Sequence, residues 1–388
     1  MKVLIYSDMC GSEWGGSEIL WSKLVPMLKE RGVQVGVTCF MSDQALRVCH
    51  NSCLSEILLL PRYAIRMPNM PWTKLLNSLS LGCLQRCWPR LWHNRQRRFC
   101  ERFSPDVVFV SMAWPGAGKP IHPYLRRSSA RYICFLHSVA EHYMESHASE
   151  ERRAFFEGAF KILATGNRSI GILEKWLGKP LGDAIPMLNF VDLDSFTARH
   201  RRPTADKRSV TRLLCVARLA IHEKGQDILL QSLSEILDLN WHLTFAGEGP
   251  DHRFLEGLAR HLGISKRVTF LGDVPSSNVP KLLKAHDVFV LSSRYEGLPL
   301  SLLEAMASGL PCIASDVGSI REVLLHEETG LLVQPNNPIQ LTEALRRMIK
   351  DVKLREKCST AGRTLVMQKC DENKFLEYIA DLLEKSSA

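Results

Sequence analysis

Short apolar runs alternate with segments of helical period along most of this 388-residue chain, and this alternation limits the folds that the chain can adopt. Strands that alternate with helices pack as a parallel sheet covered on both faces, so the pattern predicts an α/β protein. The first series of strands is expected at residues 2–6, 33–39, 107–111, 132–136, 161–165 and 185–188. The second series is expected at residues 212–217, 242–246, 268–271, 287–291 and 311–314.

A polar, basic stretch at residues 194–210 separates the two series and predicts a linker. The length suits two domains of roughly 100–200 residues each. We therefore expect two Rossmann-like, doubly wound domains, at residues 1–193 and 211–388, that face a central cleft. Strand carboxyl ends and helix N-termini would converge on that cleft, and the last helix would pack back on the first domain. Residues 51–103 break the alternation and are expected to form a basic helical insertion.

Positive charge is concentrated in one part of the chain. The formal net charge is +9, from 50 Lys and Arg against 41 Asp and Glu. Residues 51–100 carry eight of the basic side chains and one acidic one, and the excess lies between Arg62 and Arg98, near Trp88 and Trp92. Arginines attract anionic headgroups, and tryptophans lie at membrane interfaces. The segment therefore predicts binding to an anionic membrane surface, with an exposed insertion that has no partner as the alternative.

The cysteines are expected to be buried thiols, because a disulfide framework is typical of short secreted chains. Cys39, Cys134, Cys215 and Cys312 lie in strand-like apolar runs, which suits a reducing cytoplasm. The chain begins at once with a strand and not with a signal peptide, and it has no apolar run of about 18 residues. These features predict a cytoplasmic protein, peripheral at the inner face of the plasma membrane if the basic segment binds lipid.

The strongest motif runs from Ser292 to Pro311, where a strand ends and a loop leads into a helix. Pro299 suits the first turn of that helix, and Gly309 suits its end. Two backbone N–H groups after Gly297, those of Leu298 and Leu300, would have no helical partner. Pro299 between them has no N–H. Together with the helix dipole, they would stabilise a bound diphosphate.

Two glutamates in this motif are candidate ligands for hydroxyl groups. Glu296 lies in the loop, and Glu304 falls about a turn and a half into the helix. A carboxylate can accept two hydrogen bonds from vicinal hydroxyls, so Glu304 would bind a ribose and Glu296 a sugar on the other side of the phosphates. Two isolated glutamates would more often be solvated surface residues, but the surrounding motif favours the binding role.

Residues 212–335 resemble the C-terminal domain of retaining glycosyltransferase family 4, among the group 1 glycosyl transferases with the GT-B fold. The family's Glu-x7-Glu motif matches Glu296 and Glu304, and its Gly-Arg-Leu…Lys-Gly element resembles the segment with Arg218 and Lys224. The resemblance implies that Arg218 and Lys224 hold the nucleotide diphosphate. A guanidinium can bind two phosphate oxygens at once, and an ammonium acts as a movable point charge. The similarity extends over essentially the whole chain.

In the first domain, Gly15 and Gly16 follow the first strand, and glycines let a backbone approach a ligand closely. Their spacing differs from the dinucleotide fingerprint, and no acidic residue ends the second strand, so NAD binding is not predicted. The resemblance implies that this loop caps the donor phosphates and borders the acceptor. It also implies that His137, at the end of its strand, lies near the reacting sugar.

The sequence Asp192-Leu-Asp194 has the form of the Asp-x-Asp sites of metal-dependent transferases. Its setting, Asn189-Phe-Val-Asp192, resembles the family's turn at the crossing between domains, so a capping or turn role is expected instead. No metal and no cofactor besides the nucleotide-sugar co-substrate is predicted.

These features predict a retaining, metal-independent glycosyltransferase. It would move a sugar from a nucleotide-sugar donor in the second domain to a glycan or lipid-linked oligosaccharide in the first, in the assembly of a cell-surface polysaccharide such as lipopolysaccharide. Arg218, Lys224, Glu296 and His137 are the expected catalytic residues. Two alternatives stay open: a sugar-nucleotide epimerase, which needs no acceptor, and a non-enzymatic nucleic-acid-binding protein. The second is disfavoured because no nucleic-acid-binding module is recognisable, and no nucleic-acid partner is expected.

Overall fold

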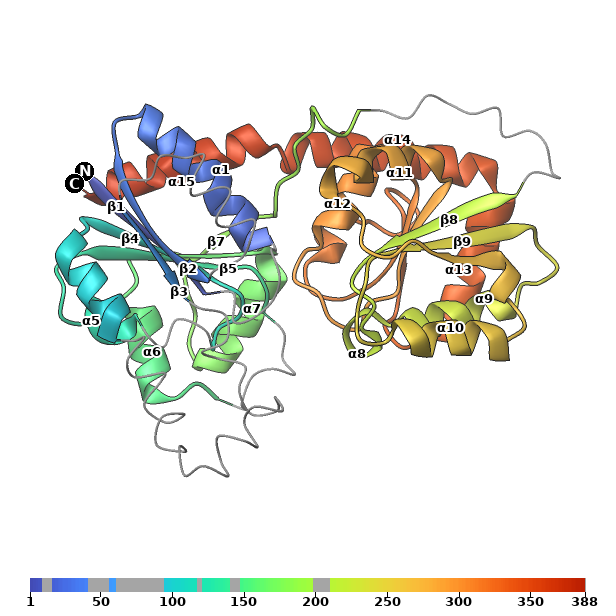
Figure 1. Cartoon of the computed structure of the whole chain (residues 1–388), viewed down its shortest axis with the longest axis horizontal. Coiled ribbons are helices and arrows are strands. Elements are labelled where there is room, and N and C mark those ends of the chain that lie inside the picture. Colours follow the sequence, from blue (N-terminus) through green and yellow to red (C-terminus); the bar gives the residue numbers. More distant parts are fainter. Residues whose placement is uncertain are drawn as a thin grey trace. The chain divides into compact units, whose positions relative to one another are not determined.

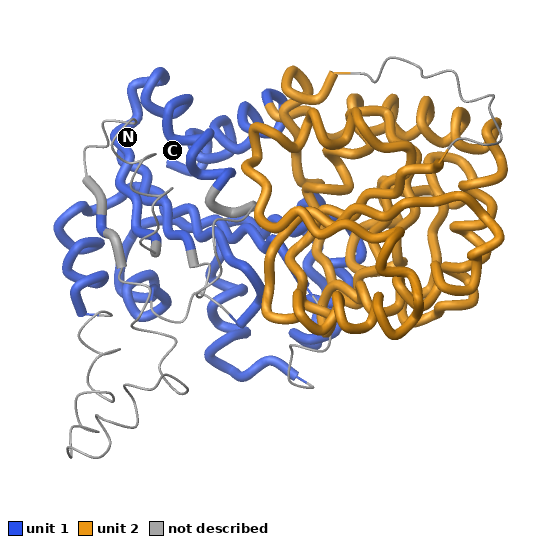
Figure 2. Tube along the Cα trace, turned by 45° about the vertical axis from the view of Figure 1, so that its right-hand side comes forward, with its two compact units in different colours: residues 1–187, 373–388 blue, residues 188–372 orange. Residues whose placement is uncertain are grey.

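The computed structural model of the chain describes residues 1–8, 16–40, 56–60, 94–116, 121–139, 147–197 and 210–387. The chain divides into two compact units (Figure 2). The first unit holds Met1–Met187 and Asn373–Ala388, and the second holds Leu188–Glu372. Each unit has a parallel sheet with helices on both faces, which confirms the predicted α/β class (Figure 1).

The first unit is built on a seven-stranded sheet of order β3-β2-β1-β4-β5-β6-β7, and all of its neighbouring strands are parallel. Its strands are β1 (Lys2–Asp8), β2 (Gln34–Phe40), β3 (Glu56–Leu60), β4 (Val107–Met112), β5 (Arg131–Leu136), β6 (Lys161–Ala164) and β7 (Ile185–Pro186). The order in which strands are added reverses between β1 and β4. Ligands of open α/β sheets bind at such a switch point, outside the carboxyl ends of the strands.

Helices cover both faces of this sheet. They are α1 (Gly16–Glu30), a helix at residues 94–103, α5 (His122–Leu125), α6 (Glu150–Glu157), α7 (Gly166–Leu177) and α15 (Glu372–Ser387). Side chains alternate between the two faces of each strand, so Leu4 and Val108 enter one core cluster with Phe155 of α6 and Leu173 of α7. The sheet is therefore buried on both sides, which explains why its strands read as nearly continuous apolar runs.

The last helix, α15, packs on the first unit, as the sequence predicts. Its Phe375 ring lies 5.9 Å from that of Phe135 on β5, measured between centroids. Leu383 is fully buried. Arg31, just after α1, donates to the Asp381 carboxylate at 2.6 Å. The C-terminal segment is thus part of the core of the first unit.

The second unit has a six-stranded parallel sheet of order β10-β9-β8-β11-β12-β13. Its strands are β8 (Thr211–Val216), β9 (Trp241–Ala246), β10 (Val268–Phe270), β11 (Val288–Leu291), β12 (Cys312–Ser315) and β13 (Leu331–Val333). The order reverses between β8 and β11, whose register pairs Val288 with Leu213 and Phe289 with Leu214. The segments that follow β8 and β11 therefore meet at the switch point of this sheet.

The helices of the second unit come from the connections between its strands. They are α8 (Ile221–Lys224), α9 (Gln226–Ser234), α10 (His252–His261), α11 (Val279–Ala285), α12 (Leu300–Ala307), α13 (Pro338–Lys350) and α14 (Val352–Lys369), with 3-10 turns at Ser265–Arg267, Ser276–Asn278 and Ile320–Glu322. Apolar side chains fill the space on both faces of the sheet, such as Leu229 of α9 on one side and Leu302 of α12 on the other.

The structure differs from the sequence expectations in two places. Residues 56–60, expected within a helical insertion, form the edge strand β3, which pairs with β2 in parallel. Their run of Ile and Leu side chains explains this, because it suits a strand at the edge of an apolar sheet. The units divide between Met187 and Leu188, ahead of the expected linker at 194–210. Residues 198–209 of that linker lie outside the described residues.

The expected thiols are observed: Cys39, Cys134, Cys215 and Cys312 are free and buried. Within the described ranges, no helix combines the length and the apolar character that crossing a membrane requires. The basic segment between Arg62 and Arg98 lies largely outside those ranges, and its membrane role stays a prediction.

Candidate active site

The loop after β11 and the start of α12 have the predicted geometry. Pro299 is the N-cap residue of α12, with extended backbone, and the helix ends at Ala307. Gly309 follows with φ +74°, a left-handed conformation that ends helices and favours glycine. The first N–H groups of a helix have no intrahelical acceptor, so those of Leu300 and Ser301 are available to a ligand with negative charge.

Lys224 and Glu296 meet at the switch point of the second sheet. Lys224 ends α8 and Glu296 lies in the loop after β11, and Nζ of Lys224 is 2.8 Å from Oε1 of Glu296. Ser293 donates its hydroxyl to the same carboxylate oxygen at 2.8 Å. The two ionic side chains are 20% and 9% exposed, so this is a largely desolvated pair and not a solvated surface contact. The sequence analysis assigned both residues to the donor site from separate segments, and in the structure their side chains are in contact.

Arg294 joins the segments that follow β8 and β11. Its guanidinium forms two hydrogen bonds of 2.8 Å with the Asp227 carboxylate and donates to the carbonyl of Ile221 and, at 2.6 Å, to Asn336. Its backbone N–H donates to the carbonyl of Glu223 at 2.8 Å. A planar guanidinium bound in this way fixes both partners in one orientation. Arg294 therefore holds α8, and with it Lys224, against the Glu296 loop.

Arg218, which follows β8, lies in the same connection as Lys224. Its guanidinium is 2.7 Å from the Glu223 carboxylate, and both side chains are substantially exposed. Its carbonyl accepts a hydrogen bond of 2.7 Å from the buried amide of Gln226. The backbone of Arg218 is thus anchored, whereas its charged head can exchange Glu223 for another anion at little cost.

Glu304 lies on α12 between the buried residues Leu303 and Ala305. Burial raises the pKa of its carboxyl group to about 7, because the charged form is poorly solvated there. No side-chain partner of Glu304 is found in the part of the chain that the structure describes. A poorly solvated acceptor of this kind gains stability from a ligand that donates hydroxyl groups.

Neighbouring loops support the backbone of the motif. Asn189 donates its amide to the carbonyl of Leu298 at 2.6 Å, and the N–H of Ser319 donates to the carbonyl of Gly297 at 2.8 Å. Gly318 has φ +53° and packs directly against the carbonyls of Gly297 and Glu296, so a side chain there would clash with the backbone of the motif. The carbonyl groups of Gly297 and Leu298 are therefore occupied within the protein.

In the first unit, the structure places His137 directly after β5. Its Nε2 is 2.9 Å from the Ser111 hydroxyl on β4, and burial lowers its pKa to about 3. Gly16 is the first residue of α1, and Gly15 lies outside the described residues. The roles predicted for these residues stay predictions.

Asp192 has the turn role that its sequence setting predicts. Its carboxylate accepts hydrogen bonds from the N–H groups of Asp194 and Ser195, at 3.2 and 3.3 Å, and from the Ser195 hydroxyl at 2.7 Å. This arrangement closes a short turn by local side-chain bonds.

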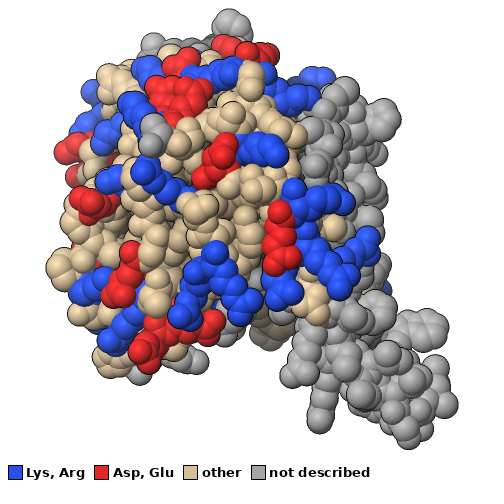
Figure 3. All heavy atoms as spheres, turned by 90° about the vertical axis from the view of Figure 1, so that its left-hand side faces the viewer, with Lys and Arg blue, Asp and Glu red and all other residues tan. Residues whose placement is uncertain are grey.

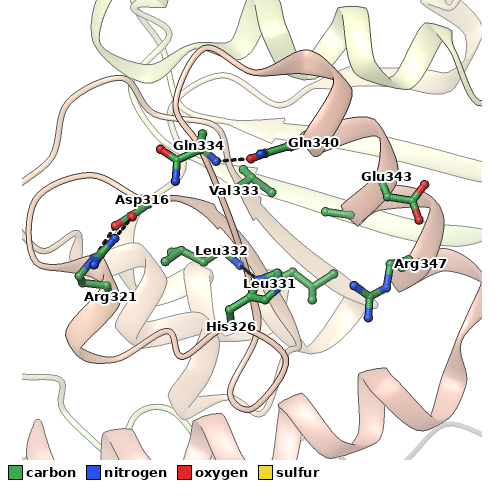
Figure 4. A pocket seen from close by; sticks show the side chains of 11 residues that line it. Asp316, Arg321, His326, Leu331, Leu332, Val333, Gln334, Gln340, Glu343 and Arg347 are labelled. Atoms are coloured by element: carbon green, nitrogen blue, oxygen red, sulfur yellow. Dashed lines mark hydrogen bonds and ion pairs between the residues drawn. The ribbon is translucent and has the colours of Figure 1, made fainter.

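A hollow of about 470 Å³ lies in the second unit, beside β13 and α13 (Figure 4). Its lining residues include none of the predicted site residues. Here Nδ1 of His326 accepts from the N–H of Leu332 at 3.1 Å, and Oε1 of Gln340 accepts from the N–H of Gln334 at 2.8 Å. These two side chains thus accept hydrogen bonds from two backbone N–H groups at the edge of the sheet, one in β13 and one directly after it.

Comparison with known proteins agrees with this geometry. Residues 197–365 match the family model described as glycosyl transferases group 1. The match lies within the second unit and covers less than half of the chain. The matched residues include Arg218, Lys224, Glu296 and Glu304, around which the site is built.

Curated relatives extend the comparison. The chain is 28% identical to N-acetyl-alpha-D-glucosaminyl L-malate synthase of Bacillus anthracis over 95% of this chain and 93% of that protein. It is 31% identical to the lipopolysaccharide core biosynthesis glycosyltransferase LpsD of Rhizobium meliloti over 43% of this chain and 48% of LpsD. The chain spans 37%, 48% and 55% of the length of three relatives that it matches at 30% identity or more.

Among solved structures, HepE of Anabaena in complex with UDP is similar with a TM-score of 0.74, at 17% identity over 99% of this chain and 100% of that one. A likeness of this kind shows the fold, which is the GT-B fold expected from the sequence. Several residues that build the site were missed by sequence reasoning, namely Asn189, Glu223, Asp227, Ser293 and Arg294. Ser293 and Arg294 lie inside the quoted motif, but their partners are distant in sequence and no spacing indicates them.

Proposed function

We propose that this chain is a retaining glycosyltransferase that moves a sugar from a nucleotide-sugar donor to a glycan or lipid-linked oligosaccharide, without a metal requirement. The observation that carries the proposal is the desolvated Lys224–Glu296 pair beside the N-terminus of α12, on the helix that also carries the Glu304 carboxylate. The relationship to a lipopolysaccharide core glycosyltransferase supports a role in the assembly of cell-surface polysaccharide. Retention is implied by the resemblance to glycosyltransferase family 4.

The difficult event in such a reaction is the departure of the nucleoside diphosphate, on which negative charge develops as the glycosidic bond to phosphate breaks. The ammonium of Lys224, the guanidinium of Arg218 and the first N–H groups of α12 are positive groups already held in place by the fold. Charges that are positioned in advance stabilise a transition state without reorganising during the reaction. These groups can therefore stabilise the leaving group.

The two glutamates bind hydroxyl groups on either side of the diphosphate in this proposal. Glu304 accepts from the ribose, since its partly buried carboxylate has no other donor among the described residues. Glu296 already accepts from Lys224 and Ser293 at one oxygen, so its second oxygen can accept from the transferred sugar. Glu296 is thereby aligned before the donor arrives.

The first unit supplies the acceptor side in this proposal, with His137 near the reacting sugar and Gly15 and Gly16 close to the ligands. We further propose that the segment from Arg62 to Arg98 binds an anionic membrane, which would bring the enzyme to a lipid-linked acceptor. Of this segment, the described part includes Arg95, Arg97 and Arg98, which are exposed on the helix at residues 94–103. On the face in Figure 3, Lys and Arg are interspersed with Asp and Glu.

The test is the release of free nucleotide from a panel of nucleotide sugars, starting with UDP sugars because HepE was solved with UDP. Turnover should persist in EDTA, and Lys224→Ala should lower it more than a hundredfold. Lys179→Ala is the matched control, because Lys179 forms an ion pair of similar length, 2.7 Å, with Glu157 on the first unit. Loss of turnover in EDTA that only a divalent cation restores would refute metal independence. An isomerised donor formed without an acceptor would indicate an epimerase instead.

A further inference from the structure

Asn189 lies at the start of the second unit, in the segment by which the chain crosses over from the first unit. Its side-chain amide donates to the carbonyl of Leu298 at 2.6 Å, directly before Pro299, the N-cap residue of α12. Both partners of this bond belong to the second unit. A residue of the crossing segment therefore holds the backbone from which α12 begins.

The crossing segment is itself held in place, so the Asn189 amide is presented from a fixed backbone. The N–H of Val191 donates to the carbonyl of Cys370 at 2.9 Å, near the point where the chain returns to the first unit. Further along the segment, the carbonyl of Phe196 accepts from the Arg363 guanidinium, which also donates to the carbonyl of Ala307, the last residue of α12. The segment is thus bonded to the protein near both ends of α12.

The sequence also suits a helix that begins one residue earlier. Proline is common at the first helical position, and Pro299 would occupy it with Leu298 as the N-cap residue. The Leu298 carbonyl would then accept from the N–H of Leu302. In the structure Pro299 instead has extended backbone, with φ −71° and ψ 128°, and Leu302 donates to the Pro299 carbonyl at 3.2 Å. The earlier start needs a ψ of about −42° at Pro299, which would turn the Leu298 peptide group away from Asn189.

The backbone of Pro299 decides which groups face a ligand at this end of α12. With the observed start, the N–H groups of Leu300 and Ser301 come before the first helical hydrogen bond. An earlier start would use the N–H of Leu302 inside the helix and would place a proline, which has no N–H, in the first turn. It would also change the angle between α12 and the loop that carries Glu296, because both are joined through Pro299.

We propose that Asn189 is a positioning residue that holds Pro299 in the extended conformation, so that the first N–H groups of α12 and the Glu296 carboxylate bind one nucleotide-sugar donor together. The identity of the ligand rests on the proposed glycosyltransferase function, whereas the effect of Asn189 on Pro299 does not. Such a bond acts on the fraction of molecules that can bind, because the apparent dissociation constant is the intrinsic one divided by that fraction. Loss of one uncharged hydrogen bond lowers the fraction up to about tenfold.

The conformation of Pro299 can be measured in the full chain with ¹³C-labelled proline, because the Cα and carbonyl chemical shifts differ between extended and helical backbone. The signals of Pro299 are identified by their loss in Pro299→Ala. Asn189→Asp keeps the shape of the side chain, but its carboxylate cannot donate to the Leu298 carbonyl. We expect extended values in the wild-type protein and a move towards helical values in Asn189→Asp and in Asn189→Ala. Signals that stay at extended values in both variants overturn the proposal, and this measurement depends on no ligand and on no activity.

Calorimetric titration then tests the effect on binding, with UDP or with the nucleoside diphosphate whose sugar turns over in the panel. Asn189→Asp should weaken binding about tenfold. Ser359→Ala is the first control, because the Ser359 hydroxyl donates to the carbonyl of Gly309 at 2.6 Å, just past the other end of α12. Asn337→Asp is the second control, because the Asn337 side chain accepts from the N–H of Gln340 at 3.0 Å, and a carboxylate accepts equally well.

Both controls should bind the nucleotide as the wild-type protein does. Unchanged binding in Asn189→Asp overturns the role of Asn189 in donor binding. Equal weakening in Ser359→Ala overturns it as well, because a general loosening of α12 would then be sufficient. A wild-type protein that binds no nucleoside diphosphate overturns the proposed function and with it the ligand, while the signals of Pro299 still decide whether Asn189 sets the start of the helix.

Discussion

Replacing Glu304 with Gln is expected to stabilise the second unit above neutral pH and to remove nucleotide binding. The amide has the shape of the carboxylate, but it carries no charge to bury. In the folded protein, burial raises the pKa of Glu304 to about 7 from its ordinary value of 4.5. Ionising Glu304 therefore costs free energy in the folded chain, whereas the unfolded chain solvates the charge freely.

The size and sign of the effect follow from this difference. One pKa unit corresponds to about 1.4 kcal/mol, so the difference amounts to roughly 3 kcal/mol. Between pH 4.5 and 7 the folded state holds a proton that the unfolded state has lost, so the free energy of unfolding falls as pH rises. The decrease in unfolding free energy that is due to Glu304 is complete above pH 7. It does not occur in Glu304→Gln, which has no carboxyl group at this position.

The assay is urea unfolding of both proteins at pH 5, 6, 7 and 8. The difference in unfolding free energy between Glu304→Gln and the wild-type protein should increase by about 2.5 kcal/mol from pH 5 to pH 8, because pH effects of other groups cancel in the difference. Calorimetric titration with a nucleoside diphosphate, in parallel, should show binding to the wild-type protein only. A difference that stays constant with pH would refute the reasoning from burial. Unimpaired binding would refute the ribose role.

Three further predictions follow from the contacts of the second unit. Glu223→Gln should strengthen binding of a nucleoside diphosphate about two- to fivefold, since Arg218 loses a competing partner, and weaker binding in calorimetry would contradict this. Arg294→Ala should lower the free energy of unfolding by about 3 kcal/mol, because Asp227 is left unpaired and largely buried, and urea titration measures the loss. Asp192→Ala should lower the free energy of unfolding by about 1 kcal/mol in the same assay, because its turn loses the bonds to Asp192. It should leave the effect of EDTA on turnover unchanged, and an effect that differs from that on the wild type would indicate a metal role.

Most strands could be predicted from the sequence because buried parallel strands are continuous apolar runs bounded by polar residues. Two of the four edge strands, β3 and β13, were not identified as strands. Each is short, and pairing with one neighbour through the backbone decides its conformation. The division between the units lies at residues 187–188, a few residues before the boundary at 193 that the polar stretch indicated.

The candidate site could be predicted where a local motif carries it. Glu296, Pro299 and Glu304 share one strand–loop–helix segment, and their relative positions follow from helix geometry. The bond between Asn189 and Leu298 joins residues 109 positions apart, and that between Ser111 and His137 joins residues 26 apart on neighbouring strands. Such contacts depend on sheet order and register, which only the folded chain displays.

The side chains beside β13 affect how copies of this protein behave when they are crowded. An edge strand is where a second chain can add to a sheet through backbone hydrogen bonds and start aggregation. At this edge, His326 and Gln340 already accept the N–H groups of Leu332 and Gln334. An incoming strand would have to displace both side chains before it could pair there, so this rim of the sheet is protected against extension by another copy.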